Sequence, residues 1–594
     1  MRKPMLFSLL PILLGSALAA PASANDKKHT PPPPVSCAEL ATDPGNGLAG
    51  NPDVKSATSQ IKAAAGANVA FCQVDILFGT NPNQNINIRV ALPLNSVDGG
   101  TGGVQGAWNG RTQGIGGGGC AGVTLTASNT PLSAQVNAGY VGSGTDAGHA
   151  GGNCEPGVNA DGTYNLQFIN DFIRNGIKEQ VLFSKAVAAR YYGQRPAYNY
   201  WNGCSTGGRQ GYLLAQELPG ELDGILANAP AIYWTRFQTA QMWGQIAMKD
   251  LVGAVVSPAK IDQTNASAVT ACDAADGVTD GIIDDPRTCK FSATANICGV
   301  PGAPATNCLT PQEAAAIDKI WDGPRNADGN KIWFGLDRGT PQDGFGLNGT
   351  PPFALGVTQF HWNEHDLNFD WQAVTMGGYA QVAQDGSRNI ADVTDTFGNL
   401  DAYRRSGGKL LTFVGGNDQL IYPRGVINYY RGQAFRLGHD DQADFDRLQK
   451  FYRLFRAPGV GHCGGGSGPQ PQNLFGALVN WVENGVAPET ILATNTAGTP
   501  PVVTRSRPLC PYPQTAIYNG GNSSTNDAAN FHCGGDLEKR RVVCADVLVK
   551  YKHEVDGKLD FEGSGVDRDA CVGHRHHGHD DDDDDHDDHG HGRW

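Results

Sequence analysis

The chain has 594 residues, 79 of them glycine, and a formal net charge of −14 at pH 7. This length suggests several domains, and the absence of any strongly basic segment argues against nucleic acid as a partner. The 14 cysteines include no Cys-x-x-Cys pair, which favours disulfides in an exported chain over zinc sites.

The first residues have the pattern of a secretory signal peptide. Arg2 and Lys3 precede an apolar stretch, and small residues at 22–24 provide a cleavage site. The stretch is shorter than the roughly 20 residues of a spanning helix, and no later segment is apolar enough to cross a bilayer. We expect a signal peptide at 1–24, a Pro-rich leader at 25–36, a secreted or periplasmic protein and no membrane partner; an uncleaved anchor is the alternative.

Residues 37–230 alternate between strand-like and helix-like segments. Short apolar runs at 86–92 and 197–201 predict strands, and longer stretches at 177–191 and 209–217 predict helices. This alternation is typical of α/β architecture.

The pattern changes at 231–400, which is rich in Trp, Asn, Asp and Gly and lacks clear alternation of strands and helices. We interpret this segment as an inserted domain. The alternation returns at 401–533, where 409–414 and 451–455 predict strands and 474–484 predicts an amphipathic helix.

Residues 203–207 read Gly-Cys-Ser-Thr-Gly and match the G-x-S-x-G nucleophile elbow, with a predicted strand before them and a helix after them. A serine hydroxyl needs a base to become a nucleophile. Asp418 and His462 each follow a predicted strand, and the order Ser, Asp, His is that of α/β-hydrolases. We predict a catalytic triad of Ser205, Asp418 and His462; the alternative is that each is an ordinary loop residue.

Cysteines flank two of these residues, because Cys204 precedes Ser205 and Cys463 follows His462. A disulfide between them would hold their Cα atoms about 4.4–6.8 Å apart and keep the nucleophile beside the base. The alternative is that each cysteine pairs elsewhere.

Ester hydrolysis also needs N–H donors for the oxyanion. The N–H of Thr206, the residue after the nucleophile, is one candidate. Four glycines at 116–119 follow a predicted strand and could supply the second, for which we choose Gly117; a flexible turn is the alternative.

Acidic residues crowd a glycine-rich loop that begins at Cys272 and is closed by Cys289. Asp273, Asp276 and Asp280 have a spacing that could mark one helix face, but the glycines and a proline make such a helix poor. Bunched carboxylates need a hard cation, and calcium takes oxygen ligands. The spacing differs from that of an EF-hand, and a solvated acidic turn is the alternative.

Residues 534–594 form an extension that ends in a tail rich in Asp and His. Imidazole and carboxylate together suit zinc, nickel or copper, so a transition-metal site is one hypothesis. A disordered, solubilising tail is the other. The histidines of the tail are His574, His576, His577, His579, His586, His589 and His591.

Taken together, these motifs resemble the tannase/feruloyl esterase family, which also includes an esterase acting on a terephthalate monoester. The resemblance extends from about residue 37 to Cys533. The matching segments are Trp-Asn-Gly-Arg at 108–111, the four glycines, Thr-Asp-Ala-Gly-His at 145–149, Gly-Cys-Ser-Thr-Gly-Gly-Arg-Gln at 203–210, Asp-Gly-Ile at 223–225, Ala-Pro-Ala at 229–231, Asn-Asp-Gln-Leu-Ile at 417–421, Gly-His-Cys-Gly-Gly at 461–465 and Arg-Pro-Leu-Cys-Pro-Tyr-Pro at 507–513.

The resemblance implies an α/β-hydrolase core at 37–230 and 401–533, with a lid at 231–400 that carries a structural calcium away from the triad. By position it assigns the calcium ligands to the side chains of Asp273, Asp276 and Asp280 and the carbonyls of Val278 and Ile282. Short spacing and the resemblance together predict the disulfides Cys272–Cys289 and Cys510–Cys533, and elimination suggests Cys544–Cys571. Two features depart from the family pattern: many members carry a His before the glycines of the Asp418 loop, and the segment after Cys533 is an addition.

The resemblance further implies a secreted serine esterase that cleaves small-molecule esters of aromatic acids. We favour feruloyl-type esters; galloyl-type and terephthalate-monoester hydrolysis are alternatives, and a non-catalytic calcium-binding module is the alternative class. Aromatic side chains of the predicted lid could form a flat slot for the acyl ring, although packing is the default role of each. They are Trp234, Trp243, Trp321, Trp333, Trp362, Trp371, Phe334, Phe353, Phe360 and Phe369.

Overall fold

A computed structural model describes residues 32–538 except 121, 124, 126–129, 153, 342–353, 397 and 439–442. The predicted signal peptide, the His/Asp-rich tail, Cys544 and Cys571 lie outside the described residues. Among the described helices, none is both long and apolar enough to cross a membrane.

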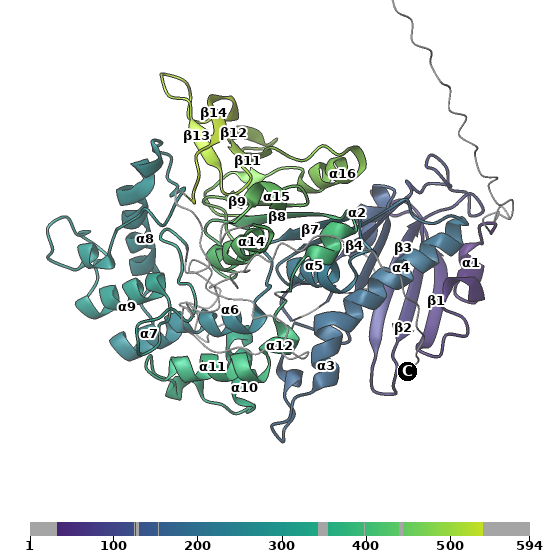
Figure 1. Ribbon diagram of the computed structural model, residues 1–594, viewed down its shortest axis with the longest axis horizontal. Coiled ribbons are helices and arrows are strands. Elements are labelled where there is room, and N and C mark those ends of the chain that lie inside the picture. Colours follow the sequence, from purple (N-terminus) through teal and green to yellow (C-terminus); the bar gives the residue numbers. More distant parts are fainter. Residues whose placement is uncertain are drawn as a thin grey trace, which may run out of the picture.

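A nine-stranded mixed sheet runs through the molecule in the order β1-β2-β3-β5-β4-β6-β7-β8-β9 (Figure 1). The strands from β5 to β9 along this order are parallel, whereas β1, β2, β3 and β5 pair antiparallel. The bounds are β1 Val54–Lys62, β2 Phe71–Phe78, β3 Ile86–Pro93, β4 Arg111–Ile115, β5 Val141–Thr145, β6 Tyr198–Cys204, β7 Gly224–Asn228, β8 Lys409–Gly415 and β9 Tyr452–Ala457.

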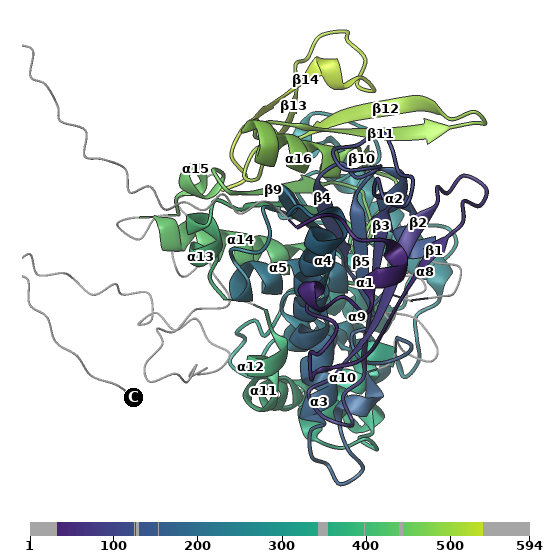
Figure 2. The same cartoon turned by 90° about the vertical axis from the view of Figure 1, so that its right-hand side faces the viewer.

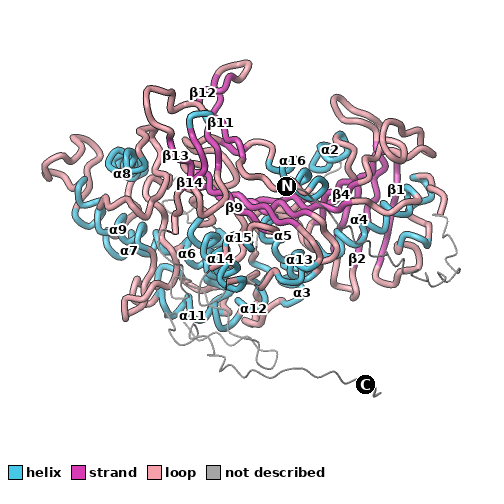
Figure 3. Tube along the Cα trace, turned by 45° about the horizontal axis from the view of Figure 1, so that its top comes forward, coloured by secondary structure: helices cyan, strands magenta, loops and turns pink. Residues whose placement is uncertain are grey.

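Helices cover both faces of this sheet, which explains why its inner strands read as continuous apolar runs. Figure 3 shows α4 and α5 on one side of the strands and α2 and α16 on the other. Successive residues of β6 follow the same division: Tyr200 packs in the core cluster under α16, and Trp201 packs in the cluster that includes α5. The bounds are α1 Cys37–Leu40, α2 Thr130–Asn137, α3 Leu166–Asn170, α4 Gly176–Tyr192, α5 Thr206–Glu217, α13 Asp401–Arg405, α14 Pro423–Leu437, α15 Phe445–Leu448 and α16 Leu474–Asn484.

A helical segment is inserted between β7 and β8 and lies at the lower left in Figure 1. Part of it has a core of its own, in which Trp243 contacts Tyr379 with ring centroids 5.1 Å apart and Phe360 is fully buried. The helices are α6 Trp234–Gln241, α7 Trp243–Val252, α8 Pro258–Cys272, α9 Pro311–Asp322, α10 Ala354–Glu364, α11 Tyr379–Asn389 and α12 Ala391–Thr394.

Two small antiparallel sheets are formed by one strand just before α16 and four strands after it, and the sequence analysis did not predict these strands. The ribbon of β11 and β12 projects from the molecule in Figure 2. Its half-exposed strands mix apolar and polar residues without a strict period, so their signal is weak. The strands are β10 Gln470–Pro471, β11 Ile491–Ala497, β12 Val502–Leu509, β13 Thr515–Tyr518 and β14 Phe531–Gly534.

Candidate active site

Ser205 lies in the sharp turn between β6 and α5. Its backbone has φ 64° and ψ −123°, a region that non-glycine residues rarely adopt. The turn is closed by hydrogen bonds in which the Ser205 N–H donates to the Asn228 carbonyl, at 3.0 Å, and the Arg209 N–H donates to the Ser205 carbonyl, at 3.0 Å. A Cβ added to Gly203 would lie 2.4 Å from backbone atoms of Gly207, so only glycine permits this close return of the chain.

His462 and Asp418 meet at the carboxyl ends of β9 and β8. His462 Nδ1 lies 2.9 Å from Asp418 Oδ2, and the Asp418 side chain is only 1% exposed. The other oxygen, Asp418 Oδ1, accepts hydrogen bonds from the N–H groups of Leu420, at 2.9 Å, and Ile421, at 2.8 Å. Because the carboxylate accepts at Nδ1, it favours the imidazole tautomer that leaves Nε2 as a proton acceptor.

A disulfide joins Cys204 to Cys463, with 6.0 Å between their Cα atoms. It brings together two residues that are 259 positions apart in the chain. Ser205 and His462 each adjoin one of these cysteines, so the bridge keeps both in one neighbourhood.

The other described cysteines are also paired. Cys272–Cys289 and Cys510–Cys533 occur as the sequence and the resemblance suggested. Three bonds were not predicted, although a short spacing of 10 residues could have suggested the last of them. They are Cys37–Cys72, Cys120–Cys154 and Cys298–Cys308.

The predicted oxyanion donor, Thr206, lies at the N-terminus of α5. Thr206 is the first residue of α5, where N–H groups have no partner within the helix and the helix dipole favours negative charge. The hydroxyl of Thr206 donates to the carbonyl of Gly119, which holds the glycine run against this helix.

The choice of Gly117 as the second donor is corrected by the structure. Its N–H already donates to Gln210 Oε1 at 3.0 Å, and the N–H of Gly116 donates to the Asn202 carbonyl at 3.1 Å. Within the glycine run, Gly118 and Gly119 therefore remain as candidates. No local pattern in the sequence indicates that Gln210, on α5, would accept a hydrogen bond from the Gly117 N–H.

Arg209 is a further residue of this site that the sequence analysis did not single out. It is fully buried on α5, with its guanidinium 4.9 Å from the ring centroid of Phe172 and 5.7 Å from that of Trp234. It donates to the carbonyl of Ile173, which lies in a π-helix at Asp171–Asn175, at 3.1 Å. Burial lowers the pKa of Arg209 to about 9. An arginine one turn after Ser205 thus anchors α5 to its surroundings.

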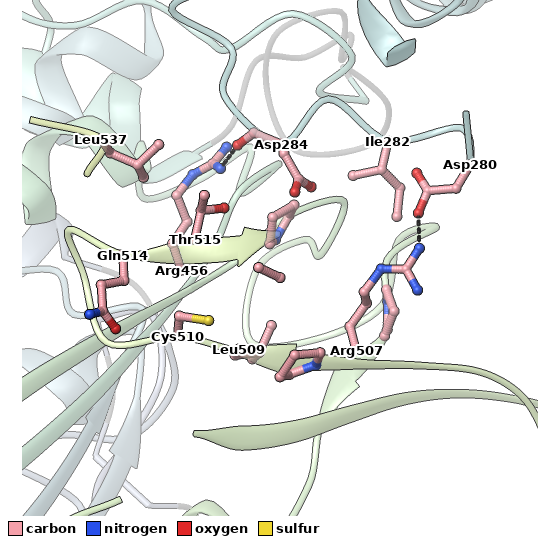
Figure 4. Close-up of a pocket in the computed structure, with 14 residues that line it drawn as sticks. Asp280, Ile282, Asp284, Arg456, Arg507, Leu509, Cys510, Gln514, Thr515 and Leu537 are labelled. Carbon is pink, nitrogen blue, oxygen red and sulfur yellow. Dashed lines mark hydrogen bonds and ion pairs between the residues drawn. The ribbon is translucent and has the colours of Figure 1, made fainter. Parts of the chain in front are cut away.

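The acidic loop, residues 272–289, folds around Asp273. The carboxylate of Asp273 accepts hydrogen bonds from the N–H groups of Asp280, at 3.0 Å, Gly281, at 2.9 Å, and Ile282, at 3.3 Å. Asp280 Oδ2 forms an ion pair with Arg507 Nη2 at 2.5 Å (Figure 4). All three predicted carboxylate ligands have partners from the protein, since Asp276 also accepts a backbone hydrogen bond.

The donor chemistry of the loop nonetheless fits calcium. Val278 and Ile282 are buried, and no hydrogen-bond donor among the described residues reaches their backbone carbonyls. Asp276 uses one oxygen to accept from the Val278 N–H at 2.9 Å. Oxygen donors of these kinds are those that calcium takes, although the described part of the chain contains no ready cluster of three or more His, Cys, Asp or Glu side chains.

The acidic loop is less separate from the triad than the resemblance implied. Arg456, in β9, donates to the backbone carbonyl of Asp284 (Figure 4). A Cβ added to Gly459 would lie 3.2 Å from the side chain of Ile282. The loop therefore contacts the segment that leads into His462.

Most tryptophans of the inserted segment are core residues. Trp234, Trp243, Trp321, Trp333 and Trp362 are each at most 5% exposed. Their burial fits packing, which the sequence analysis gives as the default role of each. The only half-buried tryptophan among the six is Trp371, and Phe353 lies outside the described residues.

Residues 104–534 match the family model described as tannase and feruloyl esterase. The chain is 34% identical over 497 residues to a probable feruloyl esterase of Arthroderma benhamiae, covering 79% of this chain and 86% of that protein. It is 28% identical over 490 residues to the mono(2-hydroxyethyl) terephthalate hydrolase of Piscinibacter sakaiensis, covering 72% and 79%.

The fold is similar to those of two solved structures. The crystal structure of an esterase from Aspergillus oryzae has a TM-score of 0.71 at 23% identity, covering 84% of this chain and all of that one. The tannin acyl hydrolase from Aspergillus niger has a TM-score of 0.70 at 22% identity, covering 85% and 97%. From the family match and the shared α/β-hydrolase fold, we conclude that this chain belongs to the tannase and feruloyl esterase family of carboxylic ester hydrolases.

Proposed function

We propose that this protein hydrolyses esters of aromatic acids with Ser205 as nucleophile, His462 as base and Asp418 as the acid that orients the base. The observation that supports this most is the double attachment of His462, which adjoins the Cys204–Cys463 disulfide and lies 2.9 Å from Asp418. One bond ties the base to the nucleophile segment, and the other ties it to a carboxylate.

In this mechanism His462 Nε2 takes the proton of Ser205 as Oγ attacks the ester carbonyl. The Asp418 carboxylate stabilises the imidazolium, and the Thr206 N–H, with Gly118 or Gly119, stabilises the oxyanion. The imidazolium then gives its proton to the leaving alcohol. Water activated by the same histidine hydrolyses the acyl-enzyme and restores Ser205.

The names of the relatives favour an aromatic acyl group, and feruloyl-type esters are our first choice. Galloyl esters and terephthalate monoesters are the alternatives, since proteins named for those activities share the family or the fold. Family membership argues against a non-catalytic calcium-binding module.

The substrate proposal predicts that kcat/KM for methyl ferulate exceeds that for an aliphatic ester of similar size by about tenfold or more. Aromatic contacts contribute roughly 0.5–1.5 kcal/mol per pair, and 1.4 kcal/mol corresponds to a factor of about ten. Methyl gallate and a terephthalate monoester, measured in parallel, rank the three acyl groups. A clear preference for the aliphatic ester would refute the aromatic assignment.

We also propose that the acidic loop binds one calcium ion, held by Asp273, Asp276 and Asp280 with the carbonyls of Val278 and Ile282. The role is structural. Calcium at about 100 times its dissociation constant is expected to stabilise the fold by about 2.7 kcal/mol, so a chelator should lower the melting temperature and calcium should restore it.

Matched variants make this calcium test specific. Asp276→Asn removes a proposed ligand and should abolish the calcium-dependent shift in melting temperature. Asp262→Asn alters an exposed residue of α8 and should leave that shift intact. The calcium proposal is refuted if the melting temperature of the unaltered protein changes with neither chelator nor calcium and elemental analysis finds no metal.

Export, to the medium or to a periplasm, is the third part of the proposal. Six disulfides join described residues, and such bonds persist in oxidising compartments. Cleavage after residue 24, read by N-terminal sequencing of the exported protein, tests it directly.

A further inference from the structure

Three consecutive residues of the loop after β8 contact the loop after β9. We name these the Asp418 loop, residues 415–421, and the base loop, residues 457–466. Asn417 Oδ1 accepts a hydrogen bond from the Gly459 N–H at 3.0 Å. Asp418 contacts the imidazole of His462, and Gln419 Oε1 accepts from the backbone N–H of His462 at 3.3 Å. The two flanking side chains therefore bind backbone on either side of the candidate acid–base contact.

The Asp418 carboxylate is itself fixed within the Asp418 loop, because its second oxygen accepts hydrogen bonds from the N–H groups of Leu420 and Ile421. The position of the imidazole relative to this carboxylate is then set by how the two loops align. Backbone hydrogen bonds secure the start of that alignment: Gly416 N–H donates to the Ala457 carbonyl at 2.7 Å, and Asn417 N–H donates to the Val460 carbonyl at 2.9 Å.

The base loop is rich in glycine and only partly ordered by its own hydrogen bonds, in which the Val460 N–H donates to the Ala457 carbonyl at 3.2 Å and the Gly461 N–H donates to the Gly465 carbonyl at 3.1 Å. It contains glycines at 459, 461 and 464–466, and glycine leaves the backbone more conformational freedom than any other residue. Beyond Val460, the Asp418 loop holds His462 at two points, through Asp418 at the imidazole and through Gln419 at the backbone N–H. Side chains of the Asp418 loop thus add to the order that these hydrogen bonds and the Cys204–Cys463 disulfide give the base loop.

We propose that Asn417 and Gln419 are positioning residues, which hold the base loop in register so that His462 faces both Asp418 and the nucleophile. The inference rests on the proposed triad. Both side chains act through His462 and its loop. Asn417 has a further neighbour, since a Cβ added to Gly339 of the inserted segment would lie 3.4 Å from Asn417 Nδ2.

The first test is Asn417→Ala and Gln419→Ala, each of which removes one acceptor. We expect kcat to fall by about 10–100-fold with KM nearly unchanged, because a misplacement of about 1 Å can cost about 10²-fold. We also expect the acid limb of the kcat/KM profile to move to lower pH, because an imidazolium that loses its alignment with Asp418 is less stabilised. A purely structural role would lower the melting temperature without moving this limb.

Gln419→Glu supplies the opposite shift. A glutamate oxygen can still accept from the His462 N–H, so most of kcat should return relative to Gln419→Ala. Its negative charge favours the imidazolium, so the acid limb should move to higher pH. This variant keeps the proposal testable even if the alanine variants do not fold.

A matched control comes from a distant asparagine. Asn51, half-buried before β1, accepts from the Asp53 N–H at 3.0 Å and donates to the Gly47 carbonyl at 3.0 Å. Asn51→Ala removes bonds of the same kind and should leave kcat and the pH profile unchanged.

The outcomes separate this inference from the proposed function. If the folded alanine variants keep the kcat and acid limb of the unaltered protein, or if Gln419→Glu shifts the limb downward, the positioning role is overturned. The triad still stands in that case, provided that Ser205→Ala is inactive. If Ser205→Ala retains activity, the proposed function itself fails, whatever the Asn417 and Gln419 variants show.

Discussion

Replacing Ser205 with alanine is expected to lower kcat on the order of 10⁶-fold, the loss found when a triad nucleophile is removed. Without Oγ no acyl-enzyme can form, and only binding and oxyanion stabilisation remain to act on direct attack by water. The strained backbone at Ser205 suits alanine no worse than serine, so the melting temperature should hardly change. Turnover of a p-nitrophenyl ester, with and without a serine-directed inhibitor, measures the effect.

The control for this change is Ser184→Ala, which removes a hydroxyl from a buried serine on α4. Its kcat and its labelling by the inhibitor should match those of the unaltered protein. A folded Ser205→Ala protein with near-normal turnover would show that the nucleophile lies elsewhere.

Asp418→Asn should be the second largest loss, about 10⁴-fold in kcat. The N–H groups of Leu420 and Ile421 both point at one carboxylate oxygen, so the asparagine must place its carbonyl there. Its NH₂ group then faces His462 Nδ1 and donates to it. That contact selects the tautomer with the proton on Nε2, which cannot accept the proton of Ser205.

The same measurements apply to Asp418→Asn, since inhibitor labelling of Ser205 should slow in parallel with ester turnover. Asp401→Asn, a change in α13 away from the proposed triad, is the matched control and should leave both rates unaltered. A loss of less than about tenfold in folded Asp418→Asn would remove Asp418 from the proposed mechanism, because tautomer control is worth far more.

The strands that carry the site could be predicted from the sequence for a physical reason. Parallel strands covered on both faces tend to be continuous apolar runs. The predicted runs at 197–201, 409–414 and 451–455 overlap β6, β8 and β9. Helix α5 begins at Thr206, earlier than predicted. The prediction missed its first turn because that turn contains two glycines, which have low helix propensity.

What the sequence could not predict depends on contacts between distant segments. The N–H of Gly117 donates a hydrogen bond to the side chain of Gln210, 93 residues away, and no local sequence pattern predicts such a bond. The acidic loop touches β9 through Arg456 and Asp284, which are 172 residues apart. The aromatic content of the inserted segment was evident from the sequence, but the positions of its side chains in the fold were not. Most of them are buried in the structure and pack in its core.

The bridge between Cys204 and Cys463 also has a consequence for when the enzyme becomes competent. A ribosome must synthesise 259 further residues after Cys204 before its partner exists, and the thiols must then meet an oxidant. In a reducing cytosol this covalent tie between the segments of Ser205 and His462 stays open. Under the proposed export, the bridge would close only after the chain has left the reducing cytosol, so the Ser205 and His462 segments would have no covalent tie inside the producing cell.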